Sequence, residues 1–112
     1  MNNLYKVITQ DGSLSLRSEK YNENFHSLLG ALNETRNKFI NPSRLERFKN
    51  KSLTVLDICF GLGYNSAFLF NKLIDQSTSL RWYGIDIDKR PLNYALNEEE
   101  FQKLWKPEVL EI

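Results

Sequence analysis

An almost unbroken apolar run over residues 53–60 constrains this chain more than any other feature of its sequence. The run reads LTVLDICF and leads into a Gly-Leu-Gly turn that ends at Gly63. A strand covered on one face alternates apolar and polar residues, whereas a continuous apolar run fits a strand covered on both faces, as in a parallel sheet. We therefore expect a buried parallel strand here, followed by a helix that starts at the turn.

A second strand and further helices are expected after that turn. The first helix is expected over residues 64–75, and residues 80–87 form the next strand-like run. Pro91 suits the first turn of a helix, where its missing amide is not needed. Another helix is expected from near Glu98, and Pro107 is expected to end it. This order is a βαβα unit of the α/β class.

The residues before the apolar run are expected to form a hairpin and then a helix. Asp11 and Gly12 are a strong turn signal between two short runs with strand character. A polar loop over residues 18–25 separates this hairpin from the next element. The spacing of apolar residues then predicts a helix over about residues 26–40.

A proline is expected to end that helix and a capping box to start another. Asn41 precedes Pro42, and the residue before a proline avoids the helical region of backbone space. Ser43 and Glu46 have the spacing of a capping box, in which each side chain accepts a backbone amide of the other's turn. A short helix through about Phe48 is therefore expected.

The chain divides into two expected parts. Residues 1–50 form an N-terminal hairpin and helical cap, and residues 51–112 form the first half of a Rossmann-like cofactor-binding domain. Two parallel strands alone would leave exposed edges and an uncovered face. We therefore expect a truncated fold, whose sheet is completed by a C-terminal continuation or by a partner chain.

Composition places few limits on function. The 112 residues carry 15 Lys and Arg against 14 Asp and Glu, a net charge of +1, so the balance neither requires nor excludes nucleic acid. The single cysteine, Cys59, cannot form an internal disulfide or a cysteine-rich metal site. No stretch approaches the ~20 apolar residues that span a bilayer, and the N-terminus lacks a secretory signal. We expect a cytoplasmic protein with no membrane partner and no metal.

The glycine turn carries the chemistry. Gly61 and Gly63 lie between a buried strand and a helix, where glycine lets the backbone approach a ligand. The following helix, which begins near Asn65, offers unpaired amides at its N-terminus. Asp86 and Asp88 lie near the end of the second strand, where an acidic side chain can hold the hydroxyls of an adenosine ribose.

The identity of the nucleotide follows from two residues. A dinucleotide fingerprint has a third glycine three residues after the second, and Ser66 stands there instead. Asp57 precedes the loop, and an acidic residue suits the cationic sulfonium and ammonium groups of S-adenosyl-L-methionine better than a pyrophosphate. The sequence therefore favours S-adenosyl-L-methionine over NAD.

Several motifs at fixed offsets before and within the glycine loop are similar to those of one family. They are Asp-Gly-Ser-Leu-Ser-Leu at 11–16, Tyr-Asn-Glu-Asn-Phe-His-Ser at 21–27, Gly-Ala with Glu34 three residues later, and the loop at 57–65. From about Thr9 to Leu96 the chain resembles the methyltransferase domain of the MnmC family, the tRNA 5-methylaminomethyl-2-thiouridine biosynthesis proteins. The resemblance implies a class I (Rossmann-like) methyltransferase fold.

The chain departs from the family pattern at some positions. Ser15 replaces a threonine, Phe25 replaces a tyrosine, and Cys59 replaces the first loop glycine. The family pattern places the ribose acid three residues before a proline, which selects Asp88. The general pattern of such folds selects Asp86, and both residues stay open.

The resemblance also implies an activity. It is methyl transfer to the amine of 5-aminomethyl-2-thiouridine at the wobble position of tRNA, which makes tRNA the expected partner. Glu23 and His26 would help to shape the cofactor pocket, while no catalytic residue is assigned. Two alternatives remain: a non-catalytic cofactor-binding or protein-interaction module, and a fragment of an NAD-dependent oxidoreductase.

Overall fold

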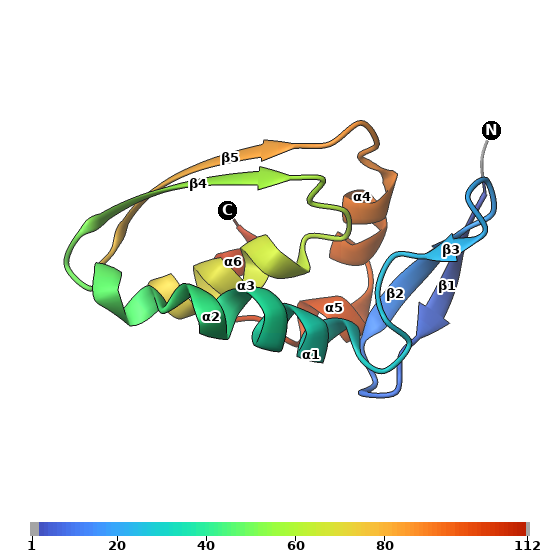
Figure 1. The fold of residues 1–112 in the computed structure, drawn as a ribbon, viewed down its shortest axis with the longest axis horizontal. Coiled ribbons are helices and arrows are strands. Elements are labelled where there is room, and N and C mark those ends of the chain that lie inside the picture. Colours follow the sequence, from blue (N-terminus) through green and yellow to red (C-terminus); the bar gives the residue numbers. More distant parts are fainter. Residues whose placement is uncertain (1–2, 112) are drawn as a thin grey trace.

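The computed structural model describes residues 3–111, which form a mixed α/β structure with two separate sheets (Figure 1). The antiparallel sheet consists of β1 (Leu4–Ile8), β2 (Leu14–Ser18) and β3 (Glu23–Asn24). The parallel pair consists of β4 (Ser52–Ile58) and β5 (Ser79–Ile85). The expected order of hairpin, helices and βαβα unit is thereby confirmed.

Helices connect the sheets and follow them. Between β3 and β4 lie α1 (Ala31–Thr35), the π-helix η1 (Arg36–Ile40), α2 (Asn41–Ser43) and the 3-10 helix η2 (Leu45–Phe48). The βαβα unit and the residues after it contain α3 (Tyr64–Leu73), α4 (Arg90–Leu96), α5 (Glu99–Gln102) and α6 (Pro107–Leu110). Figure 1 shows that these helices lie on one side of the β4–β5 pair.

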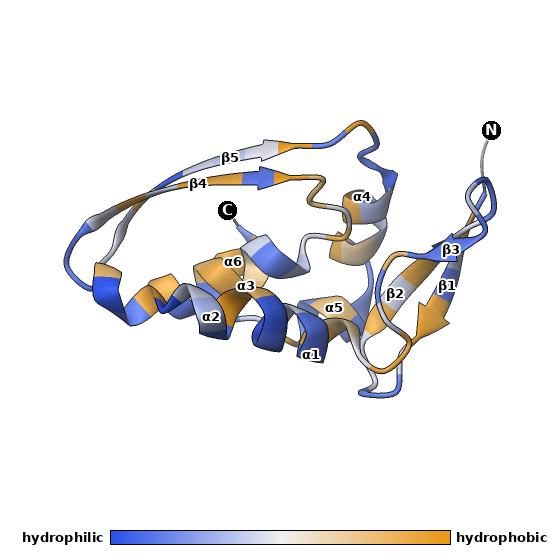
Figure 2. Ribbon diagram, viewed as in Figure 1, coloured by the Kyte–Doolittle hydropathy of each residue, from blue (hydrophilic) through white to orange (hydrophobic). Residues whose placement is uncertain are grey.

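The parallel strands are covered on one face only, which corrects the expectation that both faces are buried. Alternate residues of both strands are partly buried, and Leu53, Val55, Leu80 and Trp82 among them pack against the buried side chains of α3. The intervening residues are exposed along the full length of both strands. In Figure 2 apolar and polar segments follow one another along β4 and β5. The apolar run is therefore a strand with one partner layer in this structure.

Tyr64 joins the two sheets. It follows the glycine turn directly and is the first residue of α3. Its hydroxyl donates a hydrogen bond of 2.6 Å to the carbonyl of Leu14 in β2. Its ring packs edge-on against Phe101 and Trp105, with centroids 5.0 and 6.1 Å away. Burial raises the pKa of Tyr64 above its ordinary value, so the hydroxyl is protonated and can donate at neutral pH.

The hairpin turn caps α1, which explains the spacing of the N-terminal motifs. The amide of Ala31 donates to Thr9 Oγ1 at 3.2 Å, and the amide of Leu32 donates to Ser13 Oγ at 3.1 Å. The amide of Asn33 donates to Asp11 Oδ2 at 3.0 Å. These are the first amides of the helix, which have no partner inside it. A Cβ atom at residue 30 would lie 2.4 Å from Asp11 Oδ2, so the approach requires glycine there.

This cap corrects one predicted helix boundary. The helix expected from residue 26 begins at Ala31, and residues 25–30 form the loop that brings its first amides to the hairpin. The polar loop expected over residues 18–25 contains the short strand β3, which pairs with the end of β2.

The predicted stop at Pro42 is wrong. Asn41 has helical φ and ψ angles of −60° and −46°, and α2 continues through Pro42. The wider turn of η1 immediately before it reduces the need for the i to i−4 hydrogen bond that proline cannot make. The helical path ends at Arg44, whose φ of +52° is left-handed. Ser43 donates its hydroxyl to the carbonyl of Ile40 at 2.7 Å, so the expected capping box does not form.

The helix expected to end at Pro107 is also corrected. Helix α5 ends at Gln102, and Pro107 is the first residue of α6. This is the position where proline is tolerated best, because the first amides of a helix have no partner in it.

We predict that the Asp11 cap stabilises the fold measurably. Partial burial alone would raise the pKa of Asp11, but hydrogen bonds from Ser13, the Asn33 amide and Thr9 lower it below the ordinary value. Asp11→Ala should reduce the free energy of unfolding by about 1–2 kcal/mol in urea titrations at pH 7. Because the folded-state pKa is lowered, this contribution is present above pH 3.8 and is lost as the pH falls further.

Asp75→Ala is the matched control. Asp75 is an exposed carboxylate that pairs with Lys106, and its removal should change stability by under about 0.5 kcal/mol. Equal losses for Asp11→Ala and Asp75→Ala would show that the hairpin does not stabilise α1 through this carboxylate.

Candidate functional site

The loop at residues 59–63 turns the chain from β4 into α3. Gly61 and Gly63 have φ angles of +59° and +97°, in the left-handed region that favours glycine. A Cβ atom at residue 63 would also lie 2.9 Å from Leu92 Cδ1 in α4. The left-handed φ requires the Gly63 that the sequence singles out, and the Leu92 side chain would have to move for any larger residue. Cys59 has a φ of +59° although it carries a side chain, so this position is strained.

Asp86 ties the end of β5 to this loop. The amide of Gly61 donates to Asp86 Oδ2 at 2.9 Å, and the amide of Asp88 donates to Asp86 Oδ1 at 3.1 Å. The amide of Cys59 donates to the carbonyl of Ile85 at 2.6 Å. The structure therefore brings together the predicted residues Gly61 and Asp86, which are 25 positions apart. Each Asp86 carboxylate oxygen accepts one amide, from Gly61 or from Asp88, and keeps a further lone pair for a ligand.

Asp88 is engaged by Arg90. The Arg90 guanidinium donates from Nε to both carboxylate oxygens at 3.1 Å and from Nη2 to Oδ2 at 2.7 Å. The Arg90 amide donates to Oδ1 at 2.9 Å. The hydrogen bond from the Arg90 side chain is the main reason that the pKa of Asp88 lies below its ordinary value. A ligand hydroxyl would have to compete with this charged pair for Asp88.

Both acids line an open cavity between the hairpin and the carboxyl end of β5. Its volume is about 360 Å³. The lining residues are Leu4, Ser18, Lys20, Tyr21, Phe25, Asp86, Ile87, Asp88, Arg90 and Pro91. A Cβ atom at Gly61 would lie 3.7 Å from the Phe25 ring, so this ring lies beside the glycine loop. The cavity combines aromatic walls, two carboxylates and two basic side chains.

Sequence reasoning missed Lys20, Tyr21, Phe25 and Arg90 as lining residues. The motif at 21–27 marked this segment as important, but it could not show that its rings face the end of β5 across the cavity. For Arg90, the spacing of two residues from Asp88 was the available signal, since short acidic turns often accept the amide two residues ahead.

Two predicted site residues hold helices rather than line the cavity. Asp57 accepts a short hydrogen bond from the Ser66 hydroxyl, and Ser66 accepts one from the Trp82 indole at 2.8 Å. The Asp57 carboxylate therefore faces α3. Asn65 accepts a hydrogen bond from the Thr35 hydroxyl at 2.9 Å, which ties η1 and α1 to the start of α3.

The remaining two predicted residues lie on the hairpin side. His26 is half-buried, its Nδ1 lies 2.8 Å from the Ser15 hydroxyl, and its ring packs edge-on against Tyr64 at 5.2 Å. Burial lowers the pKa of His26, and nearby Glu34 raises it by less, so the ring is neutral at pH 7. Glu23 is exposed on β3.

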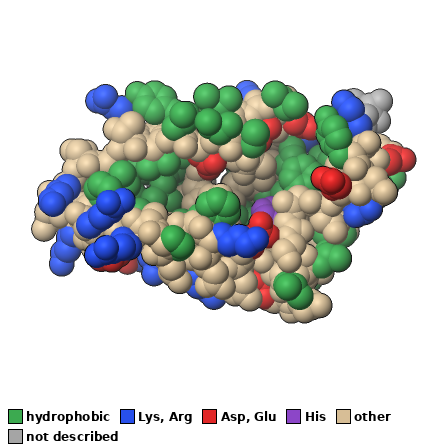
Figure 3. All heavy atoms as spheres, in the orientation of Figure 1, with side chains coloured by type: hydrophobic (Ala, Val, Ile, Leu, Met, Phe, Trp, Pro, Cys, Tyr) green, Lys and Arg blue, Asp and Glu red, His purple; other side chains and the backbone are tan. Residues whose placement is uncertain are grey.

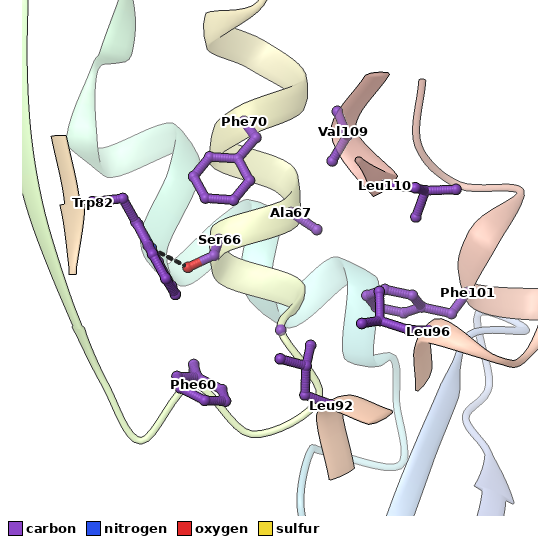
Figure 4. Close-up of a pocket in the computed structure, with 11 residues that line it drawn as sticks. Phe60, Ser66, Ala67, Phe70, Trp82, Leu92, Leu96, Phe101, Val109 and Leu110 are labelled. Carbon is purple, nitrogen blue, oxygen red and sulfur yellow. Dashed lines mark hydrogen bonds between the residues drawn. The ribbon is translucent and has the colours of Figure 1, made fainter. Parts of the chain in front are cut away.

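A second cavity lies under the sheet and is apolar (Figure 4). It has a volume of about 240 Å³ and is bounded by Phe60, Phe70, Trp82, Leu96 and Leu110 among others. The predicted site residue Gly63 lines this apolar cavity and not the open one. Ser66 is its polar side chain, and its hydroxyl is already bonded to Asp57 and Trp82. This cavity offers no charged group for a cofactor that carries a sulfonium and a ribose, so the open cavity is the candidate site.

Within residues 3–111, no cluster of three or more His, Cys, Asp or Glu side chains is arranged to hold a metal ion. The same part of the chain contains no helix with the length and apolar character needed to cross a bilayer.

Comparison with known proteins finds similarity to a curated protein and to a solved structure. No family model matches the sequence. A stretch of 68 residues is 43% identical to the uncharacterized protein MJ0670 from Methanocaldococcus jannaschii. This stretch covers 59% of this chain and 18% of that protein. The structure is similar to the crystal structure of MNMC2 from Aquifex aeolicus, with a TM-score of 0.67 and 29% identity over 81% of this chain. The chain spans 33% of that solved chain.

The structural likeness confirms the fold that the sequence predicts. The chain has an MnmC-like, Rossmann-like methyltransferase fold, with its hairpin sheet, helices and parallel strands. Because the chain spans a third of the solved chain and less of the curated relative, activity and partners are taken up as proposals.

We predict that Cys59→Gly stabilises the protein. A side chain in the left-handed region costs roughly 1 kcal/mol, and glycine removes this cost. The midpoint of urea unfolding under reducing conditions should rise by an amount equivalent to about 0.5–1 kcal/mol. Cys59→Ala removes the thiol and keeps the strain, so it should not gain this stability. An alanine variant as stable as the glycine variant would contradict backbone strain at this position.

Proposed function

We propose that this chain forms the S-adenosyl-L-methionine-binding part of a methyltransferase. The observation that carries the proposal is the hydrogen bond between the Gly61 amide and Asp86, which ties the glycine loop to a strand-end carboxylate that lines the open cavity. In this proposal residues 51–112 supply the loop and both acids, and residues 1–50 close the other side of the cavity with the hairpin.

The chemistry of the lining fits this cofactor. An adenine ring would lie against Tyr21 and Phe25, since aromatic faces stack well on a planar base. The ribose hydroxyls would donate to a carboxylate. The methionine end would reach the glycine loop and the first amides of α3, where an anionic carboxylate is favoured. When bound, the cofactor supplies an electrophilic methyl group.

The choice against NAD rests on Ser66 rather than on Asp57. The Asp57 carboxylate is bonded to Ser66 and therefore supports α3. Ser66 occupies the position of the third glycine of a dinucleotide fingerprint, and its hydroxyl fills the space between β5 and α3 by bonding to Trp82. The close helix–strand contact that a dinucleotide fold makes through a glycine is made here through a serine.

Asp86 is the better candidate for the ribose. Its carboxylate accepts two backbone amides and keeps lone pairs, whereas Asp88 is held by the Arg90 guanidinium and amide. The general pattern of such folds selects Asp86, and the family pattern selects Asp88. The ion pair between Asp88 and Arg90 favours Asp86 in this proposal.

The acceptor is proposed from the MnmC resemblance together with the likeness to MNMC2. It is the amine of 5-aminomethyl-2-thiouridine in tRNA. Transfer of a methyl group from a sulfonium to a neutral amine depends mainly on alignment of donor and acceptor. His26, which is neutral and held by Ser15, would position the hairpin. A protein-interaction module is the second candidate function, because the uncovered strand face favours it.

We predict that residues 1–112 bind S-adenosyl-L-methionine and not NAD. Gly63→Val should weaken binding at least about tenfold, or 1.4 kcal/mol, because a side chain there meets Leu92 and the backbone has a left-handed φ. Isothermal titration calorimetry with each ligand is the measurement, and circular dichroism should first show that the variant is folded. Unchanged affinity in a folded Gly63→Val variant would exclude the glycine loop as the cofactor site.

A separate prediction concerns the two acids. Asp86→Ala should weaken S-adenosyl-L-methionine binding by about 1.5–3 kcal/mol, the cost of a lost hydrogen bond to a charged group. Asp88→Ala should lose less, because Asp88 is already paired with Arg90. The same titrations check both variants, and a larger loss for Asp88→Ala would assign the ribose to Asp88.

A further inference from the structure

The Ser15 hydroxyl is buried and bonded to the loop that follows β3. Ser15 lies within β2 and has 0% of its surface exposed. Its Oγ lies 2.8 Å from Nδ1 of His26. Its neighbours Leu14 and Leu16 belong to the hydrophobic core, and alternate residues of a strand point to opposite faces. Ser15 therefore turns its hydroxyl away from those two side chains and toward the loop.

Phe25 and His26 form a bridge between β2 and the glycine loop. The amide of Phe25 donates to the carbonyl of Leu16 in β2 at 2.8 Å. The His26 ring packs edge-on against Tyr64, the first residue of α3, with ring centroids 5.2 Å apart. The Phe25 ring lies beside Gly61 and lines the open cavity. A backbone bond at residue 25 and a side-chain bond at residue 26 therefore hold this bridge to β2.

The place of the Phe25 ring depends on these bonds. The ring is 37% exposed, so neighbouring side chains enclose it only in part. Residues 25–30 form neither helix nor strand, and such a segment keeps one conformation only where its bonds fix it. In Figure 3 part of the histidine side chain, in purple, shows between its neighbours. Loss of the bond between Ser15 and His26 would let the Phe25 ring shift over the cavity.

We propose that Ser15 is a positioning residue for the cofactor site. Its hydroxyl, acting through His26, fixes Phe25 as the aromatic wall of the open cavity, where a planar base would stack. The residues that line the cavity do not include Ser15, so its effect on affinity passes through its neighbours. This inference rests on the proposed S-adenosyl-L-methionine site and gives a role to a residue that the ligand would not touch.

A double-mutant cycle of Ser15→Ala with Phe25→Ala tests this role. In calorimetric titrations with S-adenosyl-L-methionine, Ser15→Ala should weaken binding about three- to tenfold, a net hydrogen bond expressed as a ratio of affinities. In the Phe25→Ala background the same change should cost under about twofold, because the wall that it positions is gone. An equal loss in both backgrounds, or no loss in either, would overturn the proposal.

A matched pair of variants at His26 checks that the effect passes through the hydrogen bond. His26→Asn places a side-chain amide near the position of Nδ1, where it can still bond to Ser15, whereas His26→Leu has a similar branched shape without polar atoms. The leucine variant should lose as much affinity as Ser15→Ala, and the asparagine variant should lose less. Equal affinities of the two His26 variants would contradict this route.

Amide hydrogen exchange reports the same contact without the cofactor. Ser15→Ala should speed exchange of the Phe25 amide at least about threefold, while the amides shared by β1 and β2 keep their rates. Exchange at Phe25 that does not change would also overturn the proposal, whatever the affinity.

Thr78→Val is the control. Thr78 precedes β5, away from the open cavity, and its hydroxyl donates to the Phe48 carbonyl at 2.8 Å. This variant loses a hydroxyl hydrogen bond and should keep its affinity within about twofold. Circular dichroism first shows that each variant is folded. Failure of the unchanged chain to bind would overturn the proposed function and the place of Ser15 in it, whereas binding that ignores Ser15→Ala would overturn the role of Ser15 alone.

Discussion

The hydrogen bond from the Tyr64 hydroxyl to the Leu14 carbonyl ties the hairpin sheet to the start of α3. Tyr64 is placed by the glycine turn, since it is the first residue after Gly63. Its ring fills the space between β2, α5 and the segment before α6, and Phe101 and Trp105 pack around it. The turn that would hold a cofactor therefore also sets the anchor that carries the hairpin to the cavity.

Asp86 also has two structural roles. One carboxylate fixes the glycine loop through Gly61 and the following turn through the Asp88 amide. Removing it would change the shape of the loop as well as the ligand contacts. The losses of binding affinity in Asp86→Ala and Asp88→Ala can therefore be compared only if the folding of each variant is also measured. Arg90, by contrast, pairs with Asp88, and this ion pair is exposed enough to exchange with solvent.

The parts of the fold that follow from local pattern could be predicted from the sequence. The hairpin follows from its turn residues, and the βαβα unit from apolar runs and the glycine turn. The start of α1 could not be predicted, because it depends on amides donated to Thr9, Asp11 and Ser13 some twenty residues earlier. The predicted helix stop at Pro42 was wrong for a related reason. The π-helical turn η1 before it removes the steric and hydrogen-bonding conflict by which a proline normally ends a helix.

For the candidate site, the sequence could predict which residues take part but not how all of their side chains are placed. The sequence could indicate that Gly61, Gly63, Asp86 and Asp88 belong together, because βα turns lie at the carboxyl ends of parallel strands. The sequence could not show that the Asp57 carboxylate lies against Ser66 of α3. Alternate residues of a strand point to opposite faces, and the sequence alone does not say which face of β4 packs against α3. It could not show the aromatic wall either, because Phe25 reaches Gly61 through tertiary packing alone.

The uncovered strand face and the cavity are linked through β4. Ile58 is the last residue of the strand and lies on the uncovered face of the β4–β5 pair, and the strained Cys59 follows it at the start of the glycine loop. Packing that immobilises Ile58 would restrict the backbone of Cys59, because the two share a peptide unit. The amide of Cys59 is bonded to the Ile85 carbonyl, so both strand ends would be fixed together. Packing that covers this face would therefore also restrict the loop and the end of β5 that leads to Asp86.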